Sequence, residues 1–217
     1  KGTARIQAAV HFQDTADVLY VTCNVTVVQP ALSAKTITCA VNAIQTASAV
    51  DYKDMDIQWT VADSGIAAVD AKTGRITGKK AGKTSIKAVF TSKRGAEYQI
   101  EGTLIITNPQ FTQKTFVVAK GSKLKLTLTG IDGQSQTKSW KSAHSSKIAV
   151  ANGTVTAKKA GTATVSAVVD GKQVSCTVTV SEPKLDTPTL IVQKGKTAKI
   201  KVSGTKAGSV IRYKAKN

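Results

Sequence analysis

Residues 153–165 read Gly-Thr-Val-Thr-Ala-Lys-Lys-Ala-Gly-Thr-Ala-Thr-Val, and residues 74–86 read Gly-Arg-Ile-Thr-Gly-Lys-Lys-Ala-Gly-Lys-Thr-Ser-Ile. Each stretch follows a tryptophan, Trp59 or Trp140, and these two residues are 81 positions apart. The Lys-Lys-Ala-Gly steps are only 79 positions apart, so the second copy has lost two residues after its tryptophan. Similarity at a fixed period is the signature of a repeat protein. The chain therefore contains two copies of one unit.

The two ends of the chain carry parts of the same pattern. Residues 2–8 match 82–88, and residues 194–204 match 120–130. We therefore predict four segments: 1–28 as the C-terminal part of a preceding repeat, 29–108 and 109–182 as whole units, and 183–217 as the N-terminal part of a further repeat. We expect the chain to be a segment of a longer array.

Composition and alternation both favour strands. The chain has 29 Thr and 24 Val but only 8 Leu and 1 Met, and β-branched residues suit a pleated surface. Apolar and polar residues alternate along 123–128, 163–169 and 174–180. Asp170-Gly171 between the last two runs is a tight-hairpin signal. Strands this closely spaced predict an all-β class built of sandwiches, with one tryptophan as the main core residue of each.

The repeated motif resembles the bacterial immunoglobulin-like domain, group 2. Its parts are a tryptophan, a polar loop, a valine, Gly-x-Ile/Val-Thr and Lys-Lys-Ala-Gly. The resemblance implies tandem immunoglobulin-like β-sandwich domains, found mainly in extracellular proteins of bacteria and phages, as adhesin stalks or as accessory modules beside enzymes. Residues 31–38 depart from the pattern, because they lack the Lys-Gly step present at 120–121 and 194–195. The predicted core and turn residues are Trp59, Val69, Gly74, Gly82, Trp140, Val150, Gly153, Gly161, Gly171 and Cys176.

The three cysteines fall in three different repeats. Cys23 and Cys176 occupy the same slot of a last strand, in phase with inward-facing valines, and Cys39 is in phase with Ile37. We predict that all three are buried free thiols that pack as small apolar groups. The sequence has no Cys-x-x-Cys pair, so no zinc site is predicted.

No pattern predicts catalysis or a cofactor. His11 and His144 lack the nucleophile and orienting acid that a catalytic histidine needs. Asp54 and Asp56 have an alternating spacing that calcium loops use, but no Gly-turned loop or partner Glu follows them. We therefore predict a solvated acidic loop and no metal site, although calcium near Asp51–Asp56 stays open.

Positive charge rises along the chain. Lys+Arg number 31 against 13 Asp+Glu, and the net charge is 0, +3, +7 and +8 in the four successive segments. One interpretation is solubility and protection of strand edges. The other is contact with an anionic cell-wall polymer or glycan through Lys123, Lys125, Lys158, Lys159, Lys199 and Lys201. Lys123, Lys125, Lys199 and Lys201 are predicted on outward positions of strands. Nucleic acid is not predicted, because lysine far outnumbers arginine and both tryptophans are expected inside.

The leading functional hypothesis is a non-catalytic structural or adhesive stalk module at a bacterial cell surface or in a secreted protein. A Lys-rich module for anionic cell-wall polymer or glycan, and an accessory region of a surface enzyme, are the alternatives, as is a phage decoration module. A host surface protein is a further possible partner. No apolar run approaches the roughly 18 residues that a membrane span needs, so membrane insertion is not expected. The sequence also opens without a secretion leader.

Neither partial repeat can close a sandwich alone, since 1–28 supplies only late strands and 183–217 only early ones. Both would expose apolar edges. We therefore predict that the ends pair with the adjoining whole domain, or end to end with neighbouring molecules.

Overall fold

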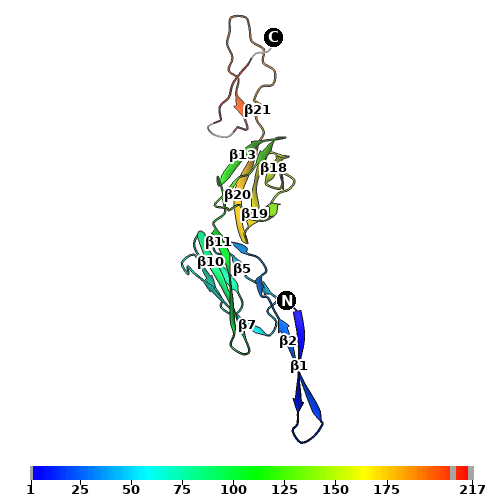
Figure 1. The fold of residues 1–217 in the computed structure, drawn as a ribbon. Helices are drawn as coiled ribbons and strands as arrows, with labels where there is room; N and C mark the ends of the chain where they lie inside the picture. Colours follow the sequence, from blue (N-terminus) through cyan, green and yellow to red (C-terminus); the bar gives the residue numbers. More distant parts are fainter. Residues whose placement is uncertain (1, 206–208, 215–217) are drawn as a thin grey trace. The chain divides into compact units, whose positions relative to one another are not determined.

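The computed structural model describes residues 2–205 and 209–214, which form strands and no helix. This confirms the all-β class and the tandem immunoglobulin-like domains predicted from the sequence. The chain divides into two compact units, residues 1–106 and 107–217 (Figure 1).

The first unit contains a complete sandwich of nine strands. These are β3 (Ala31–Leu32), β4 (Thr36–Ala40), β5 (Ile44–Thr46), β6 (Ala49–Val50), β7 (Met55–Val61), β8 (Ala67–Val69), β9 (Arg75–Gly78), β10 (Gly82–Ser92) and β11 (Glu97–Thr107). They form a four-stranded sheet in the order β4-β11-β10-β7, a three-stranded sheet β5-β9-β8 and the short pair β3-β6.

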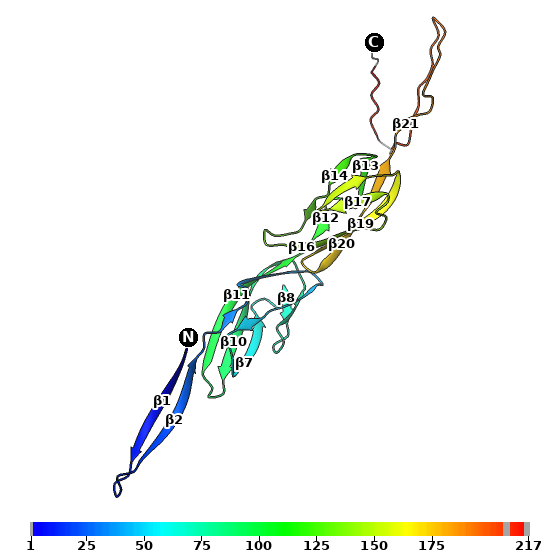
Figure 2. The same ribbon diagram turned by 90° about the vertical axis from the view of Figure 1, so that its right-hand side faces the viewer.

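The second unit repeats this plan strand for strand. Its strands are β12 (Gln110–Phe111), β13 (Thr115–Ala119), β14 (Lys123–Lys125), β15 (Leu128–Thr129), β16 (Thr137–Ser142), β17 (Ile148–Ala151), β18 (Thr154–Ala157), β19 (Gly161–Val169) and β20 (Lys172–Ser181). The sheets are β13-β20-β19-β16, β14-β18-β17 and β12-β15 (Figure 2). The two-residue deletion falls in the turn between β17 and β18, where Asn152 and Gly153 form a tight hairpin with φ of 47° and 76°.

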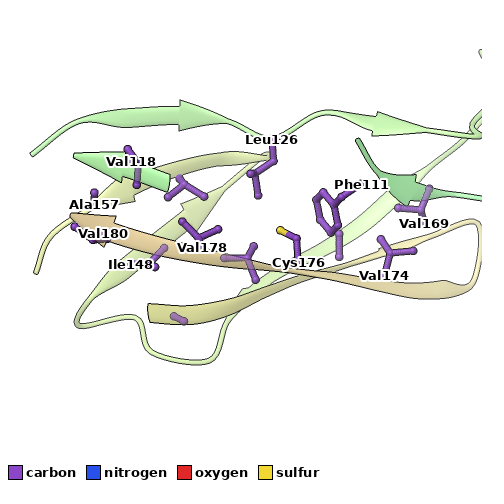
Figure 3. Close-up of a cluster of buried hydrophobic side chains, with 14 residues drawn as sticks. Phe111, Val118, Leu126, Ile148, Ala157, Val169, Val174, Cys176, Val178 and Val180 are labelled. Atoms are coloured by element: carbon purple, nitrogen blue, oxygen red, sulfur yellow. The ribbon is translucent and has the colours of Figure 1, made fainter. Parts of the chain in front are cut away.

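Each sandwich has its own apolar core. The alternating positions of β19 and β20 face inward, and Figure 3 shows their valines meeting Phe111 of β12, Ile148 of β17 and Leu126, which follows β14. In the first unit the corresponding cluster includes Phe90, which is fully buried, and Trp59. Burying one large apolar side chain contributes about 1.5–3 kcal/mol, so these alternating runs stabilise each unit separately.

The first and last long strands of the second unit lie side by side. Strand β13 runs parallel to β20, with Thr115 opposite Thr177 and Ala119 opposite Ser181. The backbone N–H of Lys120 donates to the carbonyl of Ser181 at 2.8 Å. This parallel pair closes the sandwich.

Asn42 takes the place of the glycine in the Lys-Gly pair that residues 31–38 of the first unit lack. Gly121 has a φ of 82°, and its N–H donates to the carbonyl of Ala157. Asn42 has a φ of 63° and donates to the carbonyl of Gly78, which holds the same place in β9. Asparagine tolerates the left-handed conformation better than most residues. The first unit therefore makes the same turn at Val41-Asn42, with asparagine in the place of glycine.

The N-terminal end forms a hairpin of two ten-residue strands, β1 (Gly2–His11) and β2 (Val18–Val27). These are the counterparts of the last two strands of a whole unit. Among the described residues, β1 and β2 pair with each other and with no other strand. The predicted strand pairing between this end and the adjoining whole domain is therefore not found among the described residues.

The C-terminal end is mostly without strands. Strands β21 (Lys184–Leu185) and β22 (Val202–Ser203) pair with each other, as β12 and β15 do 74 residues earlier. Within its described part, this end adds no strand to a sheet of the whole unit. Ile191 is 93% exposed and Val210 is 83% exposed, so apolar side chains are left uncovered here.

Candidate functional site

The glycine that opens each repeated motif packs against the tryptophan of its own unit. A Cβ on Gly74 would lie 3.0 Å from Trp59 Nε1 and 2.7 Å from the carbonyl oxygen of Ala47. A Cβ on Gly153 would lie 3.0 Å from Trp140 Cζ2. Both glycines have positive φ, 69° and 76°. The motif therefore needs glycine for its backbone conformation and for the close approach of the indole ring.

The two tryptophans differ in burial. Trp59 is 3% exposed, as predicted, whereas Trp140 is only half-buried at the edge of its core. Its ring meets Phe111 edge to face at a centroid distance of 5.9 Å. Val69 and Val150 are half-buried against their cores. The prediction that both tryptophans are fully inside is thus wrong for Trp140, because the second unit covers it with smaller side chains.

The two glycines of the Lys-Lys-Ala-Gly steps lie beside different types of side chain at one equivalent position. A Cβ on Gly82 would lie 3.0 Å from Ile66 Cδ1. Gly161, with a φ of 128°, lies against the alkyl chain of Lys147 instead. Ile66 and Lys147 are equivalent residues, since their carbonyls accept the two lysine N–H groups of each step. Lys147 was not predicted as part of the lysine set, and aligning the two repeats across the deletion would have found it.

The Asp170-Gly171 turn holds the start of the second unit. Its two residues have φ of 49° and 84°, as a tight hairpin requires. The carboxylate of Asp170 accepts hydrogen bonds from Thr107 Oγ1 at 2.7 Å, Ser135 Oγ at 2.7 Å and the Gln136 N–H at 2.8 Å. Thr107 is 4% exposed. Sequence reasoning missed this role, because the partners of Asp170 lie 34 to 63 residues away.

Lys123 and Lys125 lie on the outer face of the sheet β14-β18-β17, in line with their alternation. They are opposite Thr156 and Thr154 of β18, which in turn are opposite Ala149 and Ala151 of β17. Lys158 and Lys159 follow β18, and their N–H groups donate to the carbonyl of Lys147 at 2.8 and 3.2 Å. Lys123 and Lys125 therefore lie on one face beside small side chains, and Lys147, Lys158 and Lys159 are joined by backbone hydrogen bonds next to the end of β18. We call this set, Lys123, Lys125, Lys147, Lys158 and Lys159, the lysine rim.

Lys199 and Lys201 do not lie on a strand, contrary to prediction. Strand β22 begins only at Val202, and both lysines are exposed. At the 74-residue offset the counterpart of Lys199 is Lys125, which pairs with β18, whereas the counterpart of Lys201 is Thr127, which lies beyond the end of β14. The described residues of 183–217 include no strand in the place of β18. The structure therefore does not join these two lysines to the lysine rim.

The cysteines divide by location. Cys39 and Cys176 are buried, and burial raises the pKa of the Cys176 thiol to about 11. Cys23 is exposed, so the prediction of a buried thiol is wrong there. Its strand β2 has only β1 beside it, and no second layer covers the inward face.

The described residues contain no group of three or more His, Cys, Asp or Glu placed to hold a metal ion. Asp54 instead makes an exposed ion pair with Lys93 at 3.8 Å. Asp70 accepts hydrogen bonds from the N–H groups of Thr73 and Lys72, and these lower the pKa of its carboxyl. Within the described part of the chain, no helix has the length and apolar character to cross a membrane.

The comparisons with known proteins agree with this architecture. Residues 21–99 match the family model of the bacterial Ig-like domain, group 2. This confirms the resemblance predicted from the repeated motif. No curated protein matches the chain.

Among solved structures, the chain is similar to a C-terminal fragment of intimin, solved in complex with the intimin-binding domain of the translocated intimin receptor. The identity is 15% and the TM-score 0.41, over 75% of this chain and 67% of that one. Mouse cadherin-23 EC22–24 is 15% identical with a TM-score of 0.29, over 83% and 74%. The tandem Ig repeats of Dlar are 16% identical with a TM-score of 0.30, over 71% and 100%.

Proposed function

We propose that the chain is a load-bearing, non-catalytic spacer in the stalk of a bacterial surface or secreted protein. Its task is to keep a binding or catalytic part of that protein at a distance from the cell. The observation that supports this proposal is the parallel pairing of β13 with β20, the first and last long strands of one unit.

The direction of that pair determines how it responds to force. Tension reaches the unit before β13 and leaves it after β20. Because the two strands are parallel, these two points lie at opposite ends of the pair. Pulling then shears five residue pairs at once, whereas an antiparallel terminal hairpin would open one bond at a time. A shear arrangement suits a domain that must stay folded under load.

A side-chain contact reinforces the end of the pair. Lys120 Nζ lies 2.7 Å from Glu182 Oε1, and this hydrogen bond lowers the pKa of the Glu182 carboxyl. Glu182 follows β20 directly, at the point where tension leaves the unit. The contact is exposed to solvent and adds little stability by itself, but it ties the two strands where shear begins.

Single-molecule pulling on the 217-residue chain tests the proposal. Unfolding one unit of about 75 residues should release roughly 25 nm of chain. The test variant is Val118→Pro, which removes a backbone N–H that points towards β20, two residues before the N–H of Lys120. The matched control is Val150→Ala, which weakens the same core away from this pair.

We expect Val118→Pro to lower the unfolding force of one of the two events, and Val150→Ala to reduce stability with a much smaller change in force. Equal force losses in both variants, or unfolding of the unaltered units at forces too low to resolve, would argue against a load-bearing role.

A further inference from the structure

The second unit has an open groove beside Trp140. Its volume is about 570 Å³, and it is lined on one side by apolar side chains and on the other by Lys125 and Asn152. The apolar lining residues are Leu126, Leu128, Ile131 and Trp140. Ile131 is 47% exposed, so an apolar wall faces solvent here.

Two differences between the repeats explain why the groove is open. In the first unit Tyr52, the residue after Asp51, occupies the position equivalent to Ile131. The ring of Tyr52 packs on the ring of Phe90 at a centroid distance of 5.6 Å. Strand β19 has Val169 in the slot of Phe90. With isoleucine and valine in place of two aromatic rings, the second unit leaves its tryptophan partly uncovered, while Trp59 is sealed.

The charged residue in the lining of the groove is Lys125. The rim lysines Lys123 and Lys125 lie on the strand that borders it, about 7 Å apart by strand geometry. Lys125 Nζ donates to the carbonyl of Asn152 at 2.6 Å, and an ammonium group keeps two further donors. Between residues 120 and 161 the only acid is Asp132, whose Oδ1 accepts the N–H of Gln134.

The first unit differs at the same positions. Ile44 and Thr46 replace the two lysines of β14, as their pairing with Thr77 and Arg75 shows. Asp70, with its lowered pKa, takes the place of Ala151 and stays ionised at neutral pH. The first unit therefore has one cation here, Arg75 in the place of Thr154, whereas the second unit has Lys125 in the lining of the groove.

We propose that this groove binds an acidic polysaccharide. The apolar face of a sugar ring would lie on Trp140 and Ile131, and its carboxylate would meet Lys125 and Lys123. Ligand sites combine an apolar floor with a few polar groups that set orientation, and a half-buried aromatic ring with a neighbouring ammonium provides both. The remaining rim lysines would contact further acidic groups along the polymer.

The experiment measures binding of oligogalacturonate to the 217-residue chain by tryptophan fluorescence and calorimetry, at two salt concentrations. Ile131→Tyr restores the side chain of the first unit and should fill the groove. Lys125→Gln removes the charge beside the ring, and Lys138→Gln is the matched control on β16 outside the groove. Circular dichroism checks that each variant is folded.

We expect Ile131→Tyr to abolish the fluorescence change, Lys125→Gln to weaken binding about tenfold, and Lys138→Gln to have little effect. Binding should weaken at high salt and be much weaker for neutral dextran. Equal losses with Lys125→Gln and Lys138→Gln, polyphosphate bound as well as the sugar, tighter binding of an oligothymidylate, or no binding at low salt would each overturn the proposal.

Discussion

At the scale of single residues, the contact between glycine and tryptophan explains the most specific part of the repeated motif. Gly74 and Gly153 each combine a positive φ with an indole ring about 3.0 Å from where a Cβ would stand. The residue after the glycine is free to vary, and is Arg75 in one unit and Thr154 in the other. The packing of glycine against tryptophan therefore explains this part of the motif, and no ligand is needed to explain it.

Alanine at Gly153 should separate the two parts of this constraint. Gly153→Ala adds both backbone strain and a clash with Trp140, and we expect it to lower the free energy of unfolding by about 2 kcal/mol. Gly121→Ala adds backbone strain alone, since its φ is 82° and no atom lies within 4 Å, and should cost about 1 kcal/mol.

Gly133→Ala serves as the control, because its Cβ would enter open space and its φ is not positive. Urea denaturation of the three variants gives the comparison. If Gly153→Ala proved no worse than Gly121→Ala, the indole contact would not explain the motif.

At the scale of strands and turns, the sequence predicted well wherever the signal was local. The alternation of apolar and polar residues predicted β19 and β20, and the Asp170-Gly171 pair predicted the turn between them. The lysines of β14 were placed correctly for the same reason. Prediction failed where a partner from elsewhere in the chain decides the outcome. Lys199 has the local pattern of Lys125 but, among the described residues, no strand equivalent to β18 beside it. Cys23 has the pattern of Cys176 but lies on an exposed strand.

The set of hydrogen bonds to the Asp170 carboxylate is the clearest feature that local sequence could not predict. Its carboxylate accepts three hydrogen bonds, one of them from the buried Thr107. Asp170→Asn keeps the tolerance for positive φ but places an amide NH₂ against hydrogen-bond donors. We expect a loss of about 1–2 kcal/mol in the stability of the second unit.

Asp132→Asn is the matched control for this turn. Asp132 Oδ1 accepts one hydrogen bond, from the N–H of Gln134, and the oxygen of an asparagine amide can accept it equally well. Thermal unfolding followed by circular dichroism should show Asp170→Asn shifted to lower temperature and Asp132→Asn near the unaltered chain. Equal shifts in the unfolding temperature of the two variants would mean that the three hydrogen bonds at Asp170 stabilise the second unit no more than the single one at Asp132.

At the scale of the whole molecule, two units share one plan of nine strands and differ in surface and coverage. Each has a separate core cluster, which is the condition for a spacer whose units fold and unfold one by one. The two units differ in coverage and charge: the first buries its tryptophan and carries Asp70, whereas the second leaves its tryptophan half-buried beside Lys125. A common scaffold with one modified face is consistent with the proposed stalk and the proposed groove together.

Separate cores predict separate unfolding transitions. With Trp59→Phe, fluorescence reports the second unit through Trp140, and with Trp140→Phe it reports the first unit through Trp59. In the Trp59→Phe background, Gly153→Ala should lower the urea midpoint while Gly74→Ala leaves it unchanged. In the Trp140→Phe background the two effects should exchange, because effects at distant sites with no shared partners act independently. If Gly74→Ala also moved the Trp140 transition by a similar amount, the units would unfold as one cooperative body, and stepwise extension under load would have no structural basis.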